Sequence, residues 1–239
     1  MELACLVRAA IGKLRWLADQ CRPDIAYNLL ELSIQAHKPT YDTVKLVNKT
    51  MLWVKHSEYA LRYTKLKKKD WYISVFTDAS LRGLPDKVSS AMGFIILLSD
   101  GFKPGSRNKA NVLSWKSCKT KRIVASTYDV ETLALTGGLE EAIFLRDQMA
   151  KLLNIEEKEI KIEVFCDCND TVEAILVNKP LQNKNSRLEI AKVQEMRQLD
   201  MIQDIYWIPS RLQLADAFTK RGVNNEPLVD TLSDGRFSL

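Results

Sequence analysis

The chain has 239 residues, of which 46% are hydrophobic and 27% are charged. This balance is ordinary for a folded globular protein and excludes an intrinsically disordered chain. The formal charge of +5 is compatible with a polyanionic partner but does not require one. Because domains usually span roughly 100–200 residues, we expect one large domain with an appendage.

The cysteine and histidine content excludes several kinds of site. The five cysteines are odd in number and form no C-x-x-C pair, so neither a disulfide framework nor a zinc site is expected. Two histidines are too few for a His-rich metal site. No stretch of about 18 apolar residues occurs, so no membrane span is expected. A reducing compartment, in the cytoplasm or the nucleus, is the expectation.

The first part of the chain is predicted to be helical. Apolar residues at helical spacing predict helices over 3–17, 25–36 and 42–56. Asp24 follows Pro23 and is expected to cap the second helix. We predict that residues 1–69 form a connecting segment with no catalytic cluster. Its end is a basic run that we take as the linker, and which is either a solvated strand end or loop or a phosphate contact: Lys65, Lys67, Lys68 and Lys69.

The pattern then changes to strands. Three β-rich runs separated by turn residues, at 71–77, 91–98 and 111–116, predict an antiparallel meander. Ser126 and Asp129 have the spacing of a capping box, and they begin a long helix that ends near residue 153. The remaining elements are expected to be a strand at 160–166, helices at about 169–177 and 187–201, a strand at 204–208 and a helix at 214–220.

This order of elements predicts an α/β fold. Strands that alternate with helices after a meander favour a mixed five-stranded sheet flanked by helices. We expect this domain to cover residues 70–221. Residues 222–239 are polar and punctuated by Gly and Pro, so they are expected to form a loosely held tail.

Four acids stand out by their position. Asp78 follows the first strand, Glu131 lies in the second turn of the long helix, Asp167 follows the fourth strand, and Asp216 begins the last helix. Glu131 shares a helix face with Ala134, Leu135 and Gly138, so we expect it to point toward the sheet. Taken alone, an Asp after a strand is commonly a turn or cap residue and a Glu in a helix is usually a solvated surface residue, so none of the four is specific by itself.

Together, the four acids predict a metal site. Carboxylates that converge repel one another and take up protons unless cations compensate them. Oxygen ligands suit Mg²⁺ or Mn²⁺. Two such ions, about 4 Å apart, can activate water and stabilise the leaving oxygen of a phosphodiester. This chemistry needs no histidine, and none lies near these acids in the sequence.

The motifs around these acids resemble the ribonuclease H domain of copia-type retrotransposon polyproteins. Residues 112–117 (VLSWKS) with Lys119 resemble ISWKSKK, and 125–131 (ASTYDVE) resemble the start of LSSTEAEYMAL. Residues 165–167 (FCD) resemble YCDNQSAI, and 207–220 (WIPSRLQLADAFTK) resemble YVPTEEQLADIFTK. Upstream, 11–14 (IGKL) and 22–25 (RPDI) resemble the segment that links polymerase to ribonuclease H in this family.

The resemblance implies a ribonuclease H-like fold and cleavage of the RNA strand of an RNA–DNA hybrid. It implies that Asp78, Glu131, Asp167 and Asp216 hold two Mg²⁺ ions, for which Mn²⁺ can substitute. It also implies a polymerase partner, because the chain contains no Y-x-D-D motif of its own. Many ribonucleases H carry a mobile histidine where this chain has Ser210 and Arg211, so slow turnover is expected.

Several residues are candidates for contacts with the substrate. Lys116, Lys119, Lys121 and Arg122 lie between the third strand and the long helix, where they form either a phosphate-binding edge or a solvated charged loop. A second group lies beside the acids: Ser80 and Asn169 are candidates for the ribose 2′-hydroxyl or a phosphate, and Arg211 is a further candidate.

Two other features have a structural explanation and a functional one. Cys166 and Cys168 flank Asp167 and are expected to be buried cysteines at a strand end rather than ligands of a soft metal. Trp115 and Trp207 are expected in the core rather than stacked on bases.

Two alternatives to an active ribonuclease remain open. The chain could be a non-catalytic module that binds nucleic acid or a polymerase. It could also be another nuclease or a transposase on a similar fold. The four acids favour catalysis, because binding alone needs Lys and Arg. An Asp at position 216 argues against another nuclease or a transposase, since those enzymes usually carry a different acid there.

Overall fold

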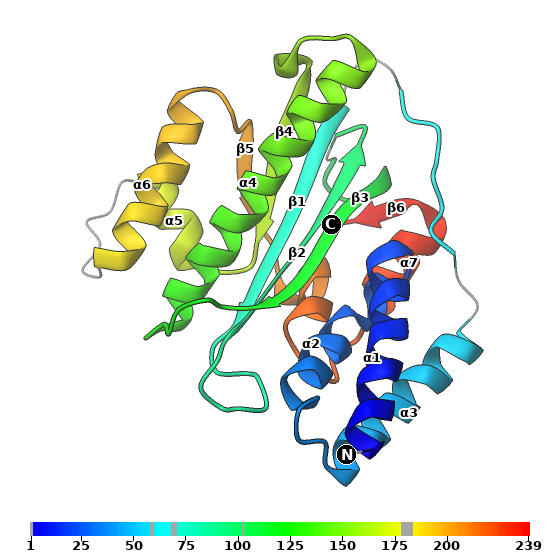
Figure 1. The fold of residues 1–239 in the computed structure, drawn as a ribbon. Helices are drawn as coiled ribbons and strands as arrows, with labels where there is room; N and C mark the ends of the chain where they lie inside the picture. The colour runs from blue at the N-terminus through cyan, green and yellow to red at the C-terminus, as the bar shows by residue number, and fades with distance from the viewer. Residues whose placement is uncertain (1, 58–59, 68–70, 102, 178–183) are drawn as a thin grey trace.

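The computed structural model describes residues 2–57, 60–67, 71–101, 103–177 and 184–239 (Figure 1). Its centre is a mixed sheet with helices on both faces, so the predicted α/β fold class is confirmed. The sheet has six strands rather than the predicted five, because the end of the chain adds one. No helix within the described ranges combines the length and the apolar character needed to cross a membrane.

The six strands lie in the spatial order β5-β4-β1-β2-β3-β6. The predicted meander of β1, β2 and β3 is antiparallel, as is the pair of β3 with β6. In contrast, β1, β4 and β5 run parallel, which requires crossover connections between them. The strand bounds are β1 (Trp71–Ser80), β2 (Ala91–Ser99), β3 (Arg107–Lys119), β4 (Ile160–Cys166), β5 (Asp204–Trp207) and β6 (Arg236–Ser238).

Most helices begin and end close to their predicted positions. The main correction is at residues 214–220, where a short 3-10 turn replaces the predicted α-helix. The α-helices are α1 (Glu2–Gln20), α2 (Ala26–Gln35), α3 (Tyr41–His56), α4 (Thr127–Leu153), α5 (Asn169–Val177), α6 (Lys184–Gln198) and α7 (Glu226–Asp234). The 3-10 turns are η1 (Pro23–Ile25), η2 (Glu157–Glu159), η3 (Ser210–Leu212) and η4 (Leu214–Phe218).

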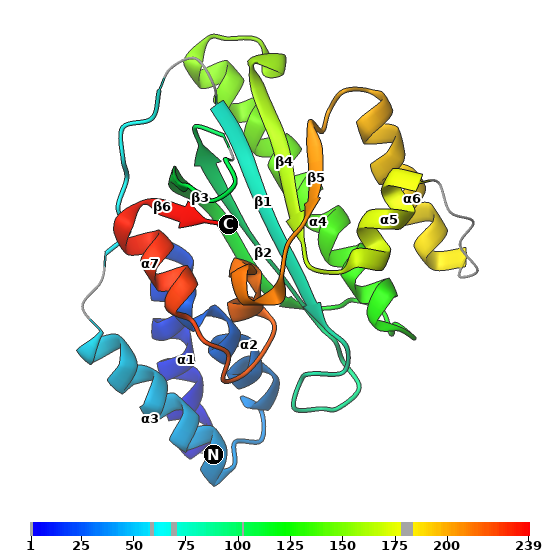
Figure 2. The ribbon, with the colours of Figure 1, turned by 180° about the vertical axis from the view of Figure 1, so that it is seen from behind.

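The helices divide between the two faces of the sheet. α4 crosses one face with α5 and α6 beside it, whereas α2, η4 and α7 lie against the other face (Figures 1 and 2). Because neighbouring residues of a strand point to opposite faces, β1 contributes Val75 to the core under α4 and Phe76 to the opposite core. Phe76 stacks on Phe165 there, with ring centroids 4.7 Å apart.

Close packing of α4 on β1 depends on Gly138. A Cβ at this position would lie 2.7 Å from Cγ2 of Thr77 and 3.2 Å from Cγ1 of Val75, so a side chain would push the helix away from the strand. Glu131 and Leu135 on the same face are buried, as the sequence predicts. The close contact of Gly138 with β1 sets the distance between Glu131 on α4 and the end of β1.

The start of α4 differs in part from its prediction. The hydroxyl of Ser126 accepts the backbone N–H of Asp129 at 3.1 Å, which is one half of the predicted capping box. The carboxylate of Asp129 instead accepts a hydrogen bond from the hydroxyl of Ser186. Asp129 therefore connects α4 to α6 rather than closing the box.

The helical segment before residue 57 has its own apolar core and also packs on the sheet. Residues of α1, α2 and α3 form that core, including Leu14, Leu29 and Val47. The indole N–H of Trp115 on β3 donates to the backbone carbonyl of Ala18 at 2.9 Å. Trp115 is also partly buried against the core, in line with its prediction. The segment is therefore attached to the face of the sheet that η4 covers.

Asp24 does not cap α2 as predicted. It is buried and forms an ion pair with Arg22, with 2.8 Å between the Oδ2 and Nη2 atoms. The indole N–H of Trp53 donates to the same oxygen at 2.5 Å. A buried carboxylate needs such partners, so Asp24 joins the start of α2 to α3 instead of serving the helix end.

The last residues of the chain are not the loosely held tail that the sequence predicts. They form α7 and β6, and the buried side chain of Phe237 packs edge-on against Phe76, with ring centroids 5.6 Å apart. β6 covers the outer edge of β3, which extends beyond its predicted bounds to Arg107–Lys119. Pairing an exposed edge in this way satisfies its backbone groups.

The predicted linker lies only partly within the described residues. Lys65 and Lys67 lie in a stretch without regular structure, and Lys109 donates to the carbonyl oxygen of Lys65 at 3.3 Å. Lys68 and Lys69 fall outside the described residues. The boundary between the helical segment and the sheet domain therefore stays a prediction.

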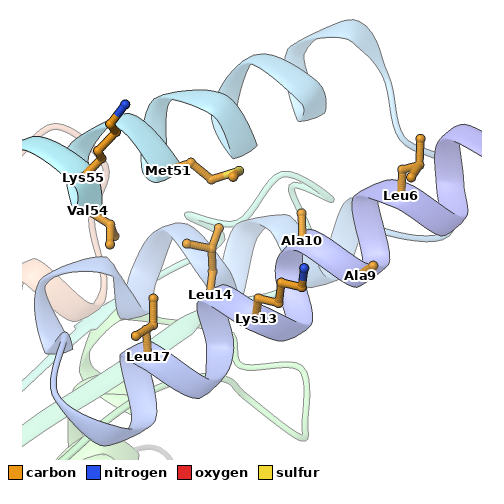
Figure 3. A pocket seen from close by; sticks show the side chains of 9 residues that line it. All are labelled: Leu6, Ala9, Ala10, Lys13, Leu14, Leu17, Met51, Val54 and Lys55. Carbon is orange, nitrogen blue, oxygen red and sulfur yellow. The ribbon is translucent and has the colours of Figure 1, made fainter.

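A groove lies between α1 and α3 in the helical segment (Figure 3). Its cavity volume is about 380 Å³. Leu14 of α1 and Met51 and Val54 of α3 point into the space between the two helices, and Lys13 and Lys55 add positive charge to its lining. The groove contains none of the four predicted acids, so it is separate from the candidate metal site.

Candidate metal centre

The strand register places two of the predicted acids side by side. Phe76 of β1 is paired with Phe165 of the parallel strand β4. Two residues further along each strand are Asp78, still within β1, and Asp167, directly after β4. Because parallel strands end at the same edge of a sheet, both carboxylates lie at this edge. Asp78 therefore belongs to the strand itself and does not follow it as predicted.

Asp78 is completely buried and has partners for both carboxylate oxygens. The hydroxyl of Thr219 donates to Oδ2, and the ammonium of Lys220 donates to Oδ1 at 3.2 Å. Burial raises the pKa of Asp78 to about 7, although Lys220 opposes this shift. Because a nearby positive charge favours the ionised form of a carboxyl group, a bound cation would lower this pKa.

Asp167 is held by the segment that follows β5. The hydroxyl of Ser210 donates to its Oδ2 at 2.6 Å, and the indole N–H of Trp207 donates to its backbone carbonyl at 3.1 Å. Trp207 is 52% exposed, so the prediction that it lies in the core is wrong. Its strand is short and lies at the edge of the sheet, which leaves the ring in solvent beside the candidate site.

Asp216 reaches the site because Gln213 fixes η4 to the sheet. The amide of Gln213 donates to the carbonyl oxygens of Thr77 and Phe165, at 3.0 and 3.4 Å, and so bridges β1 and β4 just before the two acids. Its side-chain oxygen accepts the backbone N–H of Ala215 at 3.2 Å. Asp216 therefore sits on a turn whose position is set by the strand ends.

Gly93 allows this turn to approach the sheet. It lies directly opposite Asp78 in the antiparallel pair of β1 and β2. A Cβ at Gly93 would lie 2.4 Å from the Cβ of Phe218 and 3.0 Å from Cγ2 of Thr219. A larger residue would lift η4 and carry Asp216 away from Asp78.

Glu131 enters the site from α4 and is 5% exposed. Its Oε2 atom is buried and has no hydrogen-bond partner in the described part of the chain. Burial, and then the charges of Asp78 and Asp167, raise the pKa of Glu131 to about 9. An unpartnered carboxylate oxygen in such a place is costly, and a bound cation would satisfy it.

The structure brings all four predicted acids together in two overlapping groups. Ligand atoms of Asp78, Asp167 and Asp216 lie within 4.8 Å of one another, and so do those of Glu131, Cys166 and Asp167. Asp167 belongs to both groups. The oxygen donors and the unpartnered oxygen of Glu131 fit a hard divalent cation. Cys166 is a free, buried cysteine, in agreement with its prediction, whereas Cys168 is only partly buried.

The predicted contacts on β3 and before α4 are exposed, but two of them are engaged in surface ion pairs. Lys119 pairs with Asp86 at 3.2 Å, and Arg122 pairs with Glu189 at 2.7 Å. Lys121 is exposed on the loop before α4. Lys116 is also exposed and lines a groove of about 250 Å³ between the sheet and α4. Their contact with a substrate stays a prediction.

The other predicted contacts lie near the acidic edge. Ser80 ends β1, and Asn169 begins α5, where its amide donates to Glu173 at 2.9 Å. Arg211 is exposed on η3, next to Ser210. Ser80 lies in the same strand as Asp78, Asn169 follows Asp167 closely in the chain, and Arg211 lies on the turn before η4. No interaction with a substrate is established for any of them.

Sequence reasoning missed four residues that organise the site: Ser210, Gln213, Thr219 and Lys220. All of them belong to the segment that resembles YVPTEEQLADIFTK, which was the available signal. Lys220 contacts two acids, donating to Asp216 at 2.5 Å as well as to Asp78. Partial burial opposes its charge, but Asp78 and Asp216 outweigh this effect and raise the pKa of Lys220.

Comparison with known proteins gives similarity in structure only. No protein-family model and no curated protein matches the sequence. One similar structure is the N-terminal ribonuclease H domain of a Mycobacterium tuberculosis protein, solved as a fusion with maltose-binding protein. Its sequence is 17% identical to this chain. The match covers 62% of this chain and 90% of that one, with a TM-score of 0.43. Ribonuclease H1 from Halobacterium salinarum is 18% identical, with coverage of 66% and 98% and a TM-score of 0.43.

A third similar structure is a ribonuclease H1 isolated from compost, in complex with an RNA/DNA hybrid. It is 18% identical, the match covers 62% of this chain and 93% of that one, and the TM-score is 0.45. Similarity at these identities and TM-scores carries no conclusion about the activity of this chain.

Proposed function

We propose that this chain is a ribonuclease H that hydrolyses the RNA strand of RNA–DNA hybrids. The observation that carries this proposal is the convergence of Asp78, Glu131, Asp167 and Asp216 from four separate segments at one edge of the sheet. The unpartnered oxygen of Glu131 supports a cation as the missing partner. Together with the copia-type motifs, this favours a role in retrotransposon reverse transcription.

The proposed cofactor is a pair of Mg²⁺ ions, for which Mn²⁺ can substitute. When bound, such ions supply an activated water and stabilise the leaving oxygen of a phosphodiester. The four acids hold them, with Asp167 shared between the two groups of ligand atoms. Both histidines of the chain, His37 and His56, lie in the helical segment, so no imidazole is available at the site as a general base.

The neighbours of the acids fix their orientation. Ser210 holds one oxygen of Asp167, which leaves the other oxygen free to bind a cation. Gln213 holds η4, and with it Asp216, against the ends of β1 and β4. Holding ligands in place before the cation binds reduces the cost of assembling the site.

The proposed partners are an RNA–DNA hybrid and the polymerase portion of the same polyprotein. The exposed cations Lys116 and Lys121 could neutralise backbone phosphates without reading sequence. The helical segment carries the upstream motifs that link to a polymerase in the resembling family. It also exposes large apolar side chains, among them Leu6 and Trp16, which suit a contact with another protein.

A non-catalytic binding module is the second candidate function. The specific observation in its favour is Lys220, whose ammonium is paired with two of the four acids. If this ion pair persisted in every state, divalent cations could not reach Asp78 and Asp216. The chain would then bind hybrids without cutting them.

Cleavage of labelled nucleic acids distinguishes the two functions. With Mg²⁺ or Mn²⁺, we expect the chain to cut the RNA of an RNA–DNA hybrid and to leave duplex DNA and duplex RNA of the same sequence intact. A chelator should stop the reaction. Binding of the hybrid with no cutting in either metal would support the binding module instead.

A further inference from the structure

Lys220 extends from the end of η4 into the acidic site. Its backbone N–H donates to the carbonyl oxygen of Asp216 at 3.1 Å, so the two residues are one helical turn apart and share a side. From there its ammonium reaches Oδ1 of Asp216 at 2.5 Å and Oδ1 of Asp78 at 3.2 Å. The side chain thus connects two candidate metal ligands that are 138 positions apart in the sequence (216 − 78).

The ammonium occupies a position that a divalent cation would need. The same two carboxylates, with Asp167, form a group whose ligand atoms lie within 4.8 Å of one another. An ammonium between the Oδ1 atoms of Asp78 and Asp216 repels a divalent cation and competes with it for these two oxygens. Binding of a cation there therefore requires Lys220 to move.

Lys220 is the more exposed partner in its ion pair with Asp78. Its side chain is 35% exposed, whereas that of Asp78 is 1% exposed, so the lysine has a route to solvent that the acid lacks. A lysine has a flexible stem of four carbons and keeps its charge in water at little cost. The lysine can leave the site without any change in the backbone of η4, which Gln213 holds in place.

We propose that Lys220 is an internal cation that keeps the metal-free site assembled and competes with the divalent ion for Asp78 and Asp216. This inference rests on the proposed metal centre. With Lys220 in place, its positive charge offsets part of the repulsion between Asp78 and Asp216. The cost is a weaker affinity for the divalent ion, which must displace the lysine before it binds.

Substitution of Lys220 tests this directly. Lys220→Gln retains a hydrogen-bond donor but removes the charge, so it should bind Mn²⁺ about tenfold more tightly than the parent chain in a calorimetric titration. In a chelator its unfolding temperature should fall below that of the parent. Added Mn²⁺ should therefore raise that temperature more in the variant than in the parent. Lys220→Arg keeps the charge and should bind Mn²⁺ as the parent does.

The matched control is Lys49→Gln, which removes the same charge from an exposed lysine on α3. It should leave both Mn²⁺ affinity and unfolding temperature unchanged. If Lys220→Gln bound Mn²⁺ no more tightly than the parent, the competition would be refuted while the metal centre stood. If neither the parent nor any variant bound Mn²⁺, the metal centre itself would be refuted, and the role of Lys220 with it.

Discussion

Replacing Asp78 by Asn is expected to reduce cleavage of the RNA strand by about 10²- to 10³-fold or more. Asp78 is completely buried, and its ligand atoms lie within 4.8 Å of those of Asp167 and Asp216. An amide has nearly the same shape and can still accept the hydrogen bond from Thr219, but it carries no charge to hold a divalent cation. The fold should persist while the site loses its central ligand.

The measurement is the single-turnover rate of RNA cleavage, together with Mn²⁺ binding and the far-ultraviolet circular dichroism spectrum. Asp230→Asn is the matched control, because Asp230 is exposed on α7 and the substitution is the same. The control should cut the hybrid at the parental rate. Parental activity in Asp78→Asn would exclude this residue from the catalytic site.

The second large effect concerns the pH dependence of stability in the absence of metal. Burial raises the pKa of Asp78 to about 7 and that of Glu131 to about 9, from ordinary values of 3.8 and 4.5. Both shifts favour the neutral acid in the folded state. Their contribution to stability is therefore fully present below about pH 4 and is lost as the pH rises through about 7 and about 9.

We expect the unfolding temperature in a chelator to fall by several degrees between about pH 5 and about pH 9, since each kcal/mol corresponds to about 2–4 °C in a chain of this size. Divalent cations should remove most of this fall, because they compensate the ionised acids. Glu131→Gln should flatten the profile, whereas Glu195→Gln, on the exposed side of α6, should keep the parental slope. A steep fall that survived in Glu131→Gln would assign the effect to other groups.

The sequence predicts most of the fold because the elements that form it carry strong local patterns. The long apolar strands and the helix at Thr127–Leu153 are recognisable from periodicity alone. Glu131 can be predicted to point toward the sheet because it lies on the same helix face as Leu135 and Gly138. The strand positions of Asp78 and Asp167 are sufficient to predict that they meet, provided the two strands are adjacent and parallel.

The last strand illustrates what a local pattern cannot predict. β6 has three residues, of which only Phe237 is apolar and buried, so it shows no alternation that a sequence could reveal. It forms because β3 extends beyond its apolar stretch and leaves an edge to be paired. Only the assembled sheet contains that information.

The contacts of Lys220 are a second case. Its spacing from Asp216 is visible in the sequence, but its other partner, Asp78, is 142 residues away. A lysine at the end of a short turn is ordinarily a solvated surface residue. Its position among the acids depends on the close approach of η4 to Gly93, which no local signal encodes.

Cleavage of an RNA–DNA hybrid by the parent chain and by Asp167→Asn, with Mn²⁺ and with both strands labelled, tests the central claim most directly. Asp167 belongs to both groups of candidate ligand atoms, so its loss should disable the whole site. We predict that the parent cuts the RNA strand alone and that the variant binds the hybrid but does not cut it. Equal cutting by both proteins, or cutting of the DNA strand by the parent, would contradict the assignment of this site as a ribonuclease H centre.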